Sequence, residues 1–137
     1  MKIALLLAIL SLLQTASFKA TQLTHPRVAT AYHEKETLVK GYFREKGLDY
    51  NSFNLFIRIL KKEQKVEAWI RPKGKSQYEL LHTYDFCSTS GHLGPKRKEG
   101  DGQIPEGIYR INHFNPVSNF HLSLGINYPN ESDKILS

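Results

Sequence analysis

The pattern of apolar and polar positions divides the chain into a helical part followed by a part made of strands. From His25 to Lys46 the apolar residues recur at spacings of three and four, which predicts one amphipathic helix. Pro26 suits the first turn of this helix, and Gly47 suits its end. Gly41 lies inside the helix, where it costs about 1 kcal/mol relative to alanine and weakens the middle of the element.

A period of two replaces the helical period from residue 54 onward and predicts strands. Leu55, Ile57 and Ile59 face one way in the first of them, and the residues between face the other way. A polar turn at 61–65 joins this strand to the next as a hairpin, and a third strand extends it to an antiparallel meander. The fold class predicted is mainly β with an N-terminal helix, an α+β chain. The predicted strands cover residues 54–60, 66–70, 78–86, 108–112 and 120–126.

Residues 90–107 separate the third strand from the fourth and hold five glycines and two prolines. Neither a helix nor a strand can run through such a segment, and loops of this length in compact domains tend to be functional. The basic cluster Lys96, Arg97 and Lys98 lies in it, and Lys73 and Lys75 are expected to lie nearby. Adjacent cations of this kind bind carboxylates or phosphates, although a solvated loop would carry them equally well.

Composition and charge narrow the class of protein. The 137 residues fit one domain, and the 11% aromatic content, the β-branched residues and the presence of only 6 prolines argue against disorder. The formal charge of +6 permits anionic partners, but aromatic residues do not alternate with the cations, so no nucleic acid partner is predicted. The histidines show no spacing typical of metal ligands, and one cysteine excludes a cysteine-rich zinc site. No metal and no cofactor are predicted.

The first residues have the features of a signal peptide. Lys2 precedes an apolar run from Ile3 to Leu13, and the small residues Thr15 and Ser17 suit the positions before a cleavage site. We therefore expect residues 1–17 to be removed and the rest to be exported to the periplasm or the extracellular side of the cell envelope. The run is shorter than the roughly 18 residues of a membrane-spanning helix, so no transmembrane anchor is predicted.

Cys87 is the only thiol and the only candidate for a nucleophile of that type. A cysteine needs a nearby base or cation to become a thiolate. His82 and His92 are each five positions away; in a strand, this spacing places His82 on the opposite face. The pattern favours a small apolar side chain at Cys87. The alternative is the nucleophile of an unrelated exported thiol enzyme.

Four short motifs, in this order and spacing, resemble the front part of a murein L,D-transpeptidase catalytic domain. They are Leu-Gly-Pro-Lys at 93–96, Glu-Gly-Asp at 99–101, Pro-Glu-Gly at 105–107 and Asn-Tyr-Pro-Asn at 127–130. The resemblance covers residues 54–137 and implies a partial catalytic domain there. Residues 18–53 form an N-terminal segment that contains the amphipathic helix. The resemblance also implies an antiparallel β-sandwich, which we expect to be truncated in this chain.

In the family resembled, a cysteine thiolate attacks a peptidoglycan stem peptide, and a histidine acts as the base. Both residues lie in a His-Gly…Gly-Cys motif that follows the Pro-Asn segment and has no counterpart here. No catalytic residue is therefore carried over, and the chain alone is expected to be inactive, with acyl transfer belonging to a full-length parent. Lys96, Arg97 and Lys98 are predicted to bind stem peptides. The alternatives are a non-catalytic, secreted peptidoglycan-binding module and a decayed gene fragment.

Overall fold

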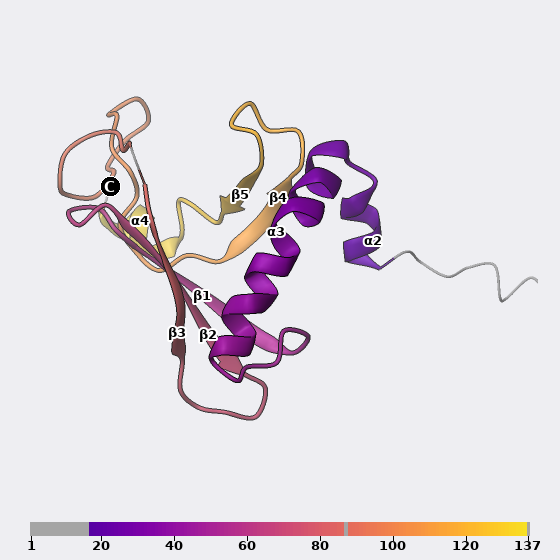
Figure 1. Cartoon of the computed structure of the whole chain (residues 1–137). Coiled ribbons are helices and arrows are strands. Elements are labelled where there is room, and N and C mark those ends of the chain that lie inside the picture. The colour runs from indigo at the N-terminus through magenta and orange to yellow at the C-terminus, as the bar shows by residue number, and fades with distance from the viewer. Residues whose placement is uncertain (1–16, 87, 137) are drawn as a thin grey trace, which may run out of the picture.

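The structure is a computed structural model that describes residues 17–86 and 88–136, so the predicted signal peptide lies, except for Ser17, outside the described residues. Helices precede the strands along the chain, and a short helix follows them (Figure 1). The elements are α2 (Phe18–Leu23), α3 (Pro26–Glu45), β1 (Phe53–Leu60), β2 (Lys65–Pro72), β3 (Glu79–Asp85), β4 (Ile111–Asn115), β5 (Ser123–Ile126) and α4 (Glu131–Leu136).

The first three strands form one antiparallel sheet in the order β1-β2-β3. The register of β1 on β2 is continuous from Phe53 opposite Pro72 to Leu60 opposite Lys65. Between β2 and β3 the register shifts at Ala68 and Trp69, which marks a bulge or irregularity. β4 and β5 pair with each other as a separate two-stranded sheet.

The C-terminal half of α3 packs on the three-stranded sheet and makes the core. Phe43 from the helix, Ile70 from β2 and Leu81 from β3 are the buried apolar side chains of the described part of the chain. The Phe43 ring lies 5.0 Å from the ring of Phe53 and 5.3 Å from that of Tyr50. These contacts explain why the helix, with mixed polar and apolar residues, is held against the sheet.

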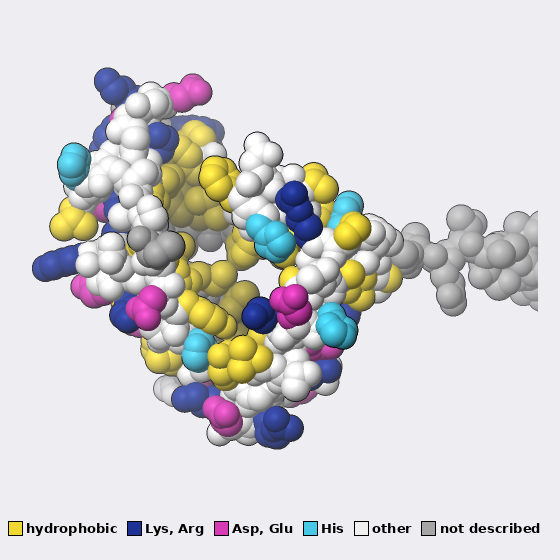
Figure 2. All heavy atoms as spheres, turned by 45° about the horizontal axis from the view of Figure 1, so that its top comes forward, with side chains coloured by type: hydrophobic (Ala, Val, Ile, Leu, Met, Phe, Trp, Pro, Cys, Tyr) yellow, Lys and Arg dark blue, Asp and Glu magenta, His cyan; other side chains and the backbone are white. Residues whose placement is uncertain are grey.

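The N-terminal half of α3 is attached to the β4–β5 hairpin instead. Arg27 Nη1 donates to the carbonyl oxygens of Ser118 at 2.7 Å and His121 at 3.1 Å. In α2, the Phe18 ring lies 5.0 Å from that of Phe114 in β4. An apolar groove of about 280 Å³ lies between the helices and the hairpin. In Figure 2, hydrophobic side chains surround a hollow near the centre of the view.

Polar side chains that follow β5 hold the segment that precedes β4. The amide of Arg110 donates to Asn127 Oδ1 at 2.6 Å, and Tyr109 donates its hydroxyl to Asp133 Oδ1 at 2.9 Å. Asp133 and Asn130 exchange backbone and side-chain bonds at the start of α4, at 2.9 and 3.1 Å, in the manner of a capping box. Burial and the contact with Asp133 raise the pKa of Tyr109 to about 12.

The predicted fold class is confirmed: the chain has an N-terminal helix and antiparallel sheets. Within the described residues, β1, β2 and β3 form one sheet and β4 and β5 form another, with no strand shared between them. The last two strands begin three residues later than predicted. Side-chain bonds from Asn127 and Asn130 hold residues 108–110, and His121 has a positive φ of 75°, which turns the chain before β5.

Candidate functional site

The loop between β3 and β4 contains the predicted substrate-binding residues, and the carboxylate of Asp101 organises its tip. This carboxylate accepts from Lys96 Nζ at 2.7 Å and from the amides of Arg97, Lys98 and Gln103 at 2.8, 3.0 and 3.0 Å. The Lys96 ammonium first, and then the amides, hold the pKa of Asp101 far below its usual range. The tip is therefore a turn built around one anion.

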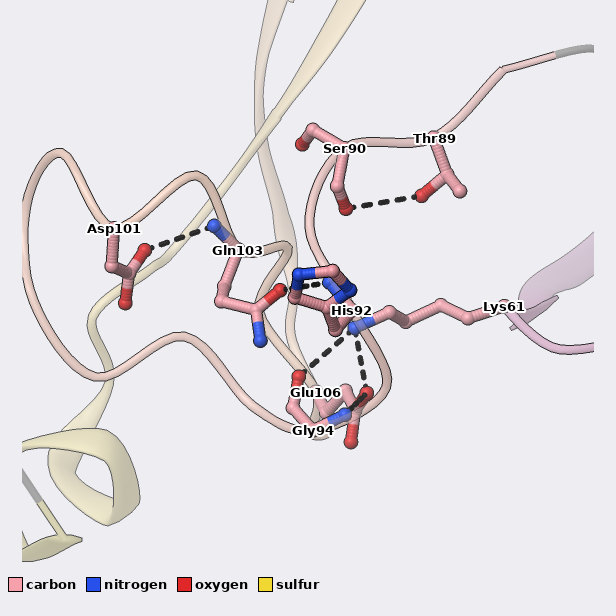
Figure 3. Close-up of polar contacts among 8 residues, drawn as sticks. All are labelled: Lys61, Thr89, Ser90, His92, Gly94, Asp101, Gln103 and Glu106. Carbon is pink, nitrogen blue, oxygen red and sulfur yellow. Dashed lines mark hydrogen bonds and ion pairs between the residues drawn. The ribbon is translucent and has the colours of Figure 1, made fainter.

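A second carboxylate, that of Glu106, holds the base of the loop to the β1–β2 turn (Figure 3). Its Oε1 accepts from Lys61 Nζ at 2.7 Å and from the Gly94 amide at 3.1 Å. Lys61 also donates to the Gly94 carbonyl oxygen at 3.0 Å. The Lys61 ammonium is the main cause that lowers the pKa of Glu106. These bonds connect the two arms of the loop to each other and to the sheet.

Gln103 makes a third link, between the arms of the loop. Its Oε1 accepts from the His92 amide at 2.6 Å. Gly91 precedes this amide with a φ of 74°, and a Cβ at that position would lie 2.8 Å from the Gly102 carbonyl oxygen. Because the carbonyl oxygen of Gly102 belongs to the backbone, it could move away only if the loop itself shifted, so only glycine fits at position 91. The loop is thus ordered by polar contacts although it contains no helix or strand.

The structure separates the three predicted substrate-binding residues by environment. The Lys96 side chain is 19% exposed, and its ammonium is paired with Asp101. Arg97 and Lys98 are exposed at the tip, where their amides are fixed by the same carboxylate. Lys96 is therefore placed to position the other two.

The expectation that Lys73 and Lys75 lie near this cluster is wrong. They follow the C-terminal end of β2, whereas the loop joins the sheet at Lys61, beside the N-terminal end of β2 (Figure 1). The eight residues of β2 separate the two places by about 25 Å. The expectation grouped cations of two different loops without considering that these loops lie at opposite ends of β2.

The other candidate residues do not come together as a catalytic set. Cys87 lies outside the described residues. His82 stacks on Tyr42 of α3, with ring centres 4.1 Å apart, and His92 lies in the loop. Within residues 17–86 and 88–136, no three histidine, cysteine or acidic side chains gather in a way that would hold a metal ion.

Two residues of the loop framework were missed by sequence reasoning. Lys61 lies about 30 positions before the loop, and a lysine in a polar turn carries no signal of a distant carboxylate partner. Gln103 lies between the Glu-Gly-Asp and Pro-Glu-Gly motifs, but nothing in the sequence indicates its bond with the His92 amide. Asp101 and Glu106, by contrast, belong to the short motifs that carry the family resemblance, and the structure gives both a physical role.

Acid should release the base of the loop. Because Lys61 lowers the pKa of Glu106 in the folded chain, the unfolded chain binds this proton more readily. The bonds of Glu106 then stabilise the loop fully above about pH 4.3, the ordinary glutamate pKa, and lose this effect as the pH falls through the lowered value. In an NMR titration, the Gly94 amide resonance is expected to move only below about pH 4.3.

The matched control for this titration is Glu106→Gln, which keeps an acceptor oxygen and removes the ionisation. In this variant the resonance of Gly94 should no longer follow the acid titration. A midpoint at or above the ordinary glutamate pKa in the unaltered chain would contradict the ion pair.

In the part of the chain that the structure describes, none of the helices has the length and apolar character needed to cross a membrane.

Comparisons with known proteins bear on the identity of the chain. No family model matches the chain, and no solved structure matches it. The chain is 37% identical over 82 residues to "Putative L,D-transpeptidase YafK" of Escherichia coli strain K12, and equally to the protein of that name from Escherichia coli O157:H7.

The match covers 58% of this chain and 32% of each relative. The chain thus spans about one third of the length of these curated relatives. The predicted resemblance to the L,D-transpeptidase family is confirmed for that part of the chain.

Proposed function

We propose that the chain binds peptidoglycan in the cell envelope, as the part of an L,D-transpeptidase-type domain that shapes the substrate site. Its similarity to the two proteins named "Putative L,D-transpeptidase YafK" supports the family and the substrate class. The observation that carries the proposal is the ordered loop at 91–107. The motifs of the family resemblance build this loop around Asp101 and Glu106, and its tip presents Arg97 and Lys98.

The loop binds the anionic groups of stem peptides in this proposal. Free carboxylates are the anions that a peptidoglycan peptide offers, and a guanidinium binds them through two parallel hydrogen bonds. Arg97 and Lys98 are exposed and project from a backbone fixed by Asp101. Lys96 contributes by holding that carboxylate, so its role is positioning.

The acyl-transfer step takes place in a longer parent protein. A cysteine thiolate attacks the stem-peptide carbonyl, the amine leaves with a proton from a histidine, and an acceptor amine or water then releases the acyl group. The described residues do not supply this pair. The described residues bury three apolar side chains, and an apolar groove lies open between the helices and the β4–β5 hairpin; both observations support a domain that further polypeptide completes.

Binding to purified peptidoglycan sacculi tests the proposal. The full chain should sediment with sacculi, and the double variant Arg97→Gln, Lys98→Gln should lose most of this binding. The matched control is Arg44→Gln, Lys46→Gln, which removes the same charge from exposed residues at the end of α3. This control should bind like the unaltered chain.

Equal binding by the two double variants would show that net charge alone attracts the chain, and absence of binding by the unaltered chain would remove the proposed substrate. The same preparations are expected to form no new amide bond when incubated with muropeptides and an amine acceptor. A product from the chain alone, detected by mass spectrometry, would overturn the assignment of the nucleophile to a longer parent.

A further inference from the structure

β1 is an edge strand that lacks the usual protection against pairing with another strand. Its one paired side faces β2, and within the described residues no strand pairs with the other side. Its register is uninterrupted over eight residues, which contain no glycine and no proline. Natural edges are normally interrupted by bulges, shortened, or marked by proline and charge.

The other edges of the two sheets carry such features. β3 has a register shift against β2 and begins and ends with an acidic residue. β4 has a register shift against β5, and β5 has only four residues. Among the described strands, β1 is therefore the long and regular edge.

The side chains of β1 favour association as well. Leu55 and Phe56 are exposed, and Ile59 is 61% exposed. The one charged side chain is Arg58, whose Nε donates to Glu67 at 2.6 Å while its guanidinium lies 5.2 Å from the centre of the Trp69 ring. Since the ion pair neutralises Arg58, this edge presents little charge that would repel an approaching strand.

We propose that β1 pairs with β1 of a second copy of this chain, antiparallel and with Ile57 at the two-fold axis. The two sheets then form one continuous sheet of six strands. A two-fold axis perpendicular to the sheet keeps the faces of both copies on the same side, so the axis must pass through a residue position.

The side chains select this position. With the axis at Ile57, Leu55 lies across from Ile59 of the second copy, and Arg58 lies across from Phe56 of the second copy. The first pair joins apolar side chains, and the second brings a cation to an aromatic ring twice in each dimer. An axis at Phe56 would place Arg58 across from Asn54 of the second copy, and an axis at Arg58 would place the two guanidinium groups across from each other, so neither position brings Arg58 to an aromatic ring of the second copy.

The dimer is weak and depends on salt. A single pair of edge strands makes a small interface, and each copy carries a formal charge of +6. Salt screens the repulsion between the copies without weakening the backbone hydrogen bonds of the new strand pair to the same extent. Association should therefore increase with ionic strength.

Disulfide trapping tests both the pairing and its register, in the full chain with Cys87 replaced by serine. Opposed residues in antiparallel strands have Cα atoms about 4.5–5.5 Å apart, within the reach of a disulfide. Ile57→Cys should therefore form a covalent dimer under mild oxidation. In Ile59→Cys, the two cysteines would lie four positions apart along the strands, about 13 Å. The amount of covalent dimer in this variant should therefore stay at the background level.

This pair of variants separates the proposal from general stickiness. Ile59 is more exposed than Ile57, so random collisions would trap Ile59→Cys more efficiently. Equal trapping, or more trapping at Ile59, would overturn the proposal, provided that far-UV circular dichroism shows both variants folded. Dimers seen by light scattering without trapping at Ile57 would also overturn it, because the interface would then lie elsewhere. Binding to sacculi does not depend on this outcome.

Discussion

The variant Phe43→Ala is expected to lose about 3–5 kcal/mol of its free energy of unfolding. Phe43 is 2% exposed and joins α3 to the sheet, where its ring contacts those of Tyr50 and Phe53. Its removal takes away buried apolar area and leaves a cavity. Since small domains have only about 5–15 kcal/mol in total, this loss is a large part of the stability.

Urea unfolding followed by fluorescence measures this loss, because Trp69 is the only tryptophan and lies in β2, the central strand of the three-stranded sheet. The matched control is Leu38→Ala on the same helix, where the side chain is exposed and the change should cost less than about 1 kcal/mol. A similar loss in both variants would show that α3 does not pack through the face that contains Phe43.

The variant Asp101→Ala is expected to release the tip of the loop while the sheet stays folded. Four donors lose their acceptor at once, and the Lys96 ammonium loses its counter-ion. An acceptor whose pKa is held far below its usual range is one whose charged form is strongly stabilised by the fold. Hydrogen exchange should show the amides of Arg97, Lys98 and Gln103 exchanging at nearly the rate of an unfolded peptide.

Glu99→Ala is the control for this experiment, since it removes the same charge from an exposed residue two positions away. The exchange of the three amides should not change in that variant. Protection that persists in Asp101→Ala would show that the turn forms without its central carboxylate. The pairing of β1 with β2 serves as an internal reference, because its amides should keep their protection in both variants.

The elements with a regular pattern were predicted well from the sequence. The helix expected at 25–46 is α3, which continues through Gly41 because a tertiary contact at Phe43 outweighs the local cost. The first hairpin and the third strand also follow the alternation that predicted them. Short helices escaped prediction: α2 has six residues capped by Ser17, and α4 depends on the exchange between Asn130 and Asp133.

The candidate site shows where pattern alone stops. Three adjacent cations in the sequence suggest three equivalent ligands, yet Lys96 is neutralised by Asp101 and only its neighbours are exposed. Lys96 and Asp101 are five positions apart in a glycine-rich loop, and whether they meet depends on the turn that forms between them. The bond from Lys61 to Glu106 joins residues 45 positions apart, which no local spacing indicates.

The bonds of Arg27 bear on the order in which the chain assembles. This side chain reaches carbonyl oxygens 91 and 94 positions further along, whereas α3 and the β1–β2–β3 meander need only neighbouring segments. Contacts between distant segments carry a larger loop-closure entropy and form more slowly than local ones. The β4–β5 hairpin is therefore expected to dock last, on a helix and a three-stranded sheet that have already formed.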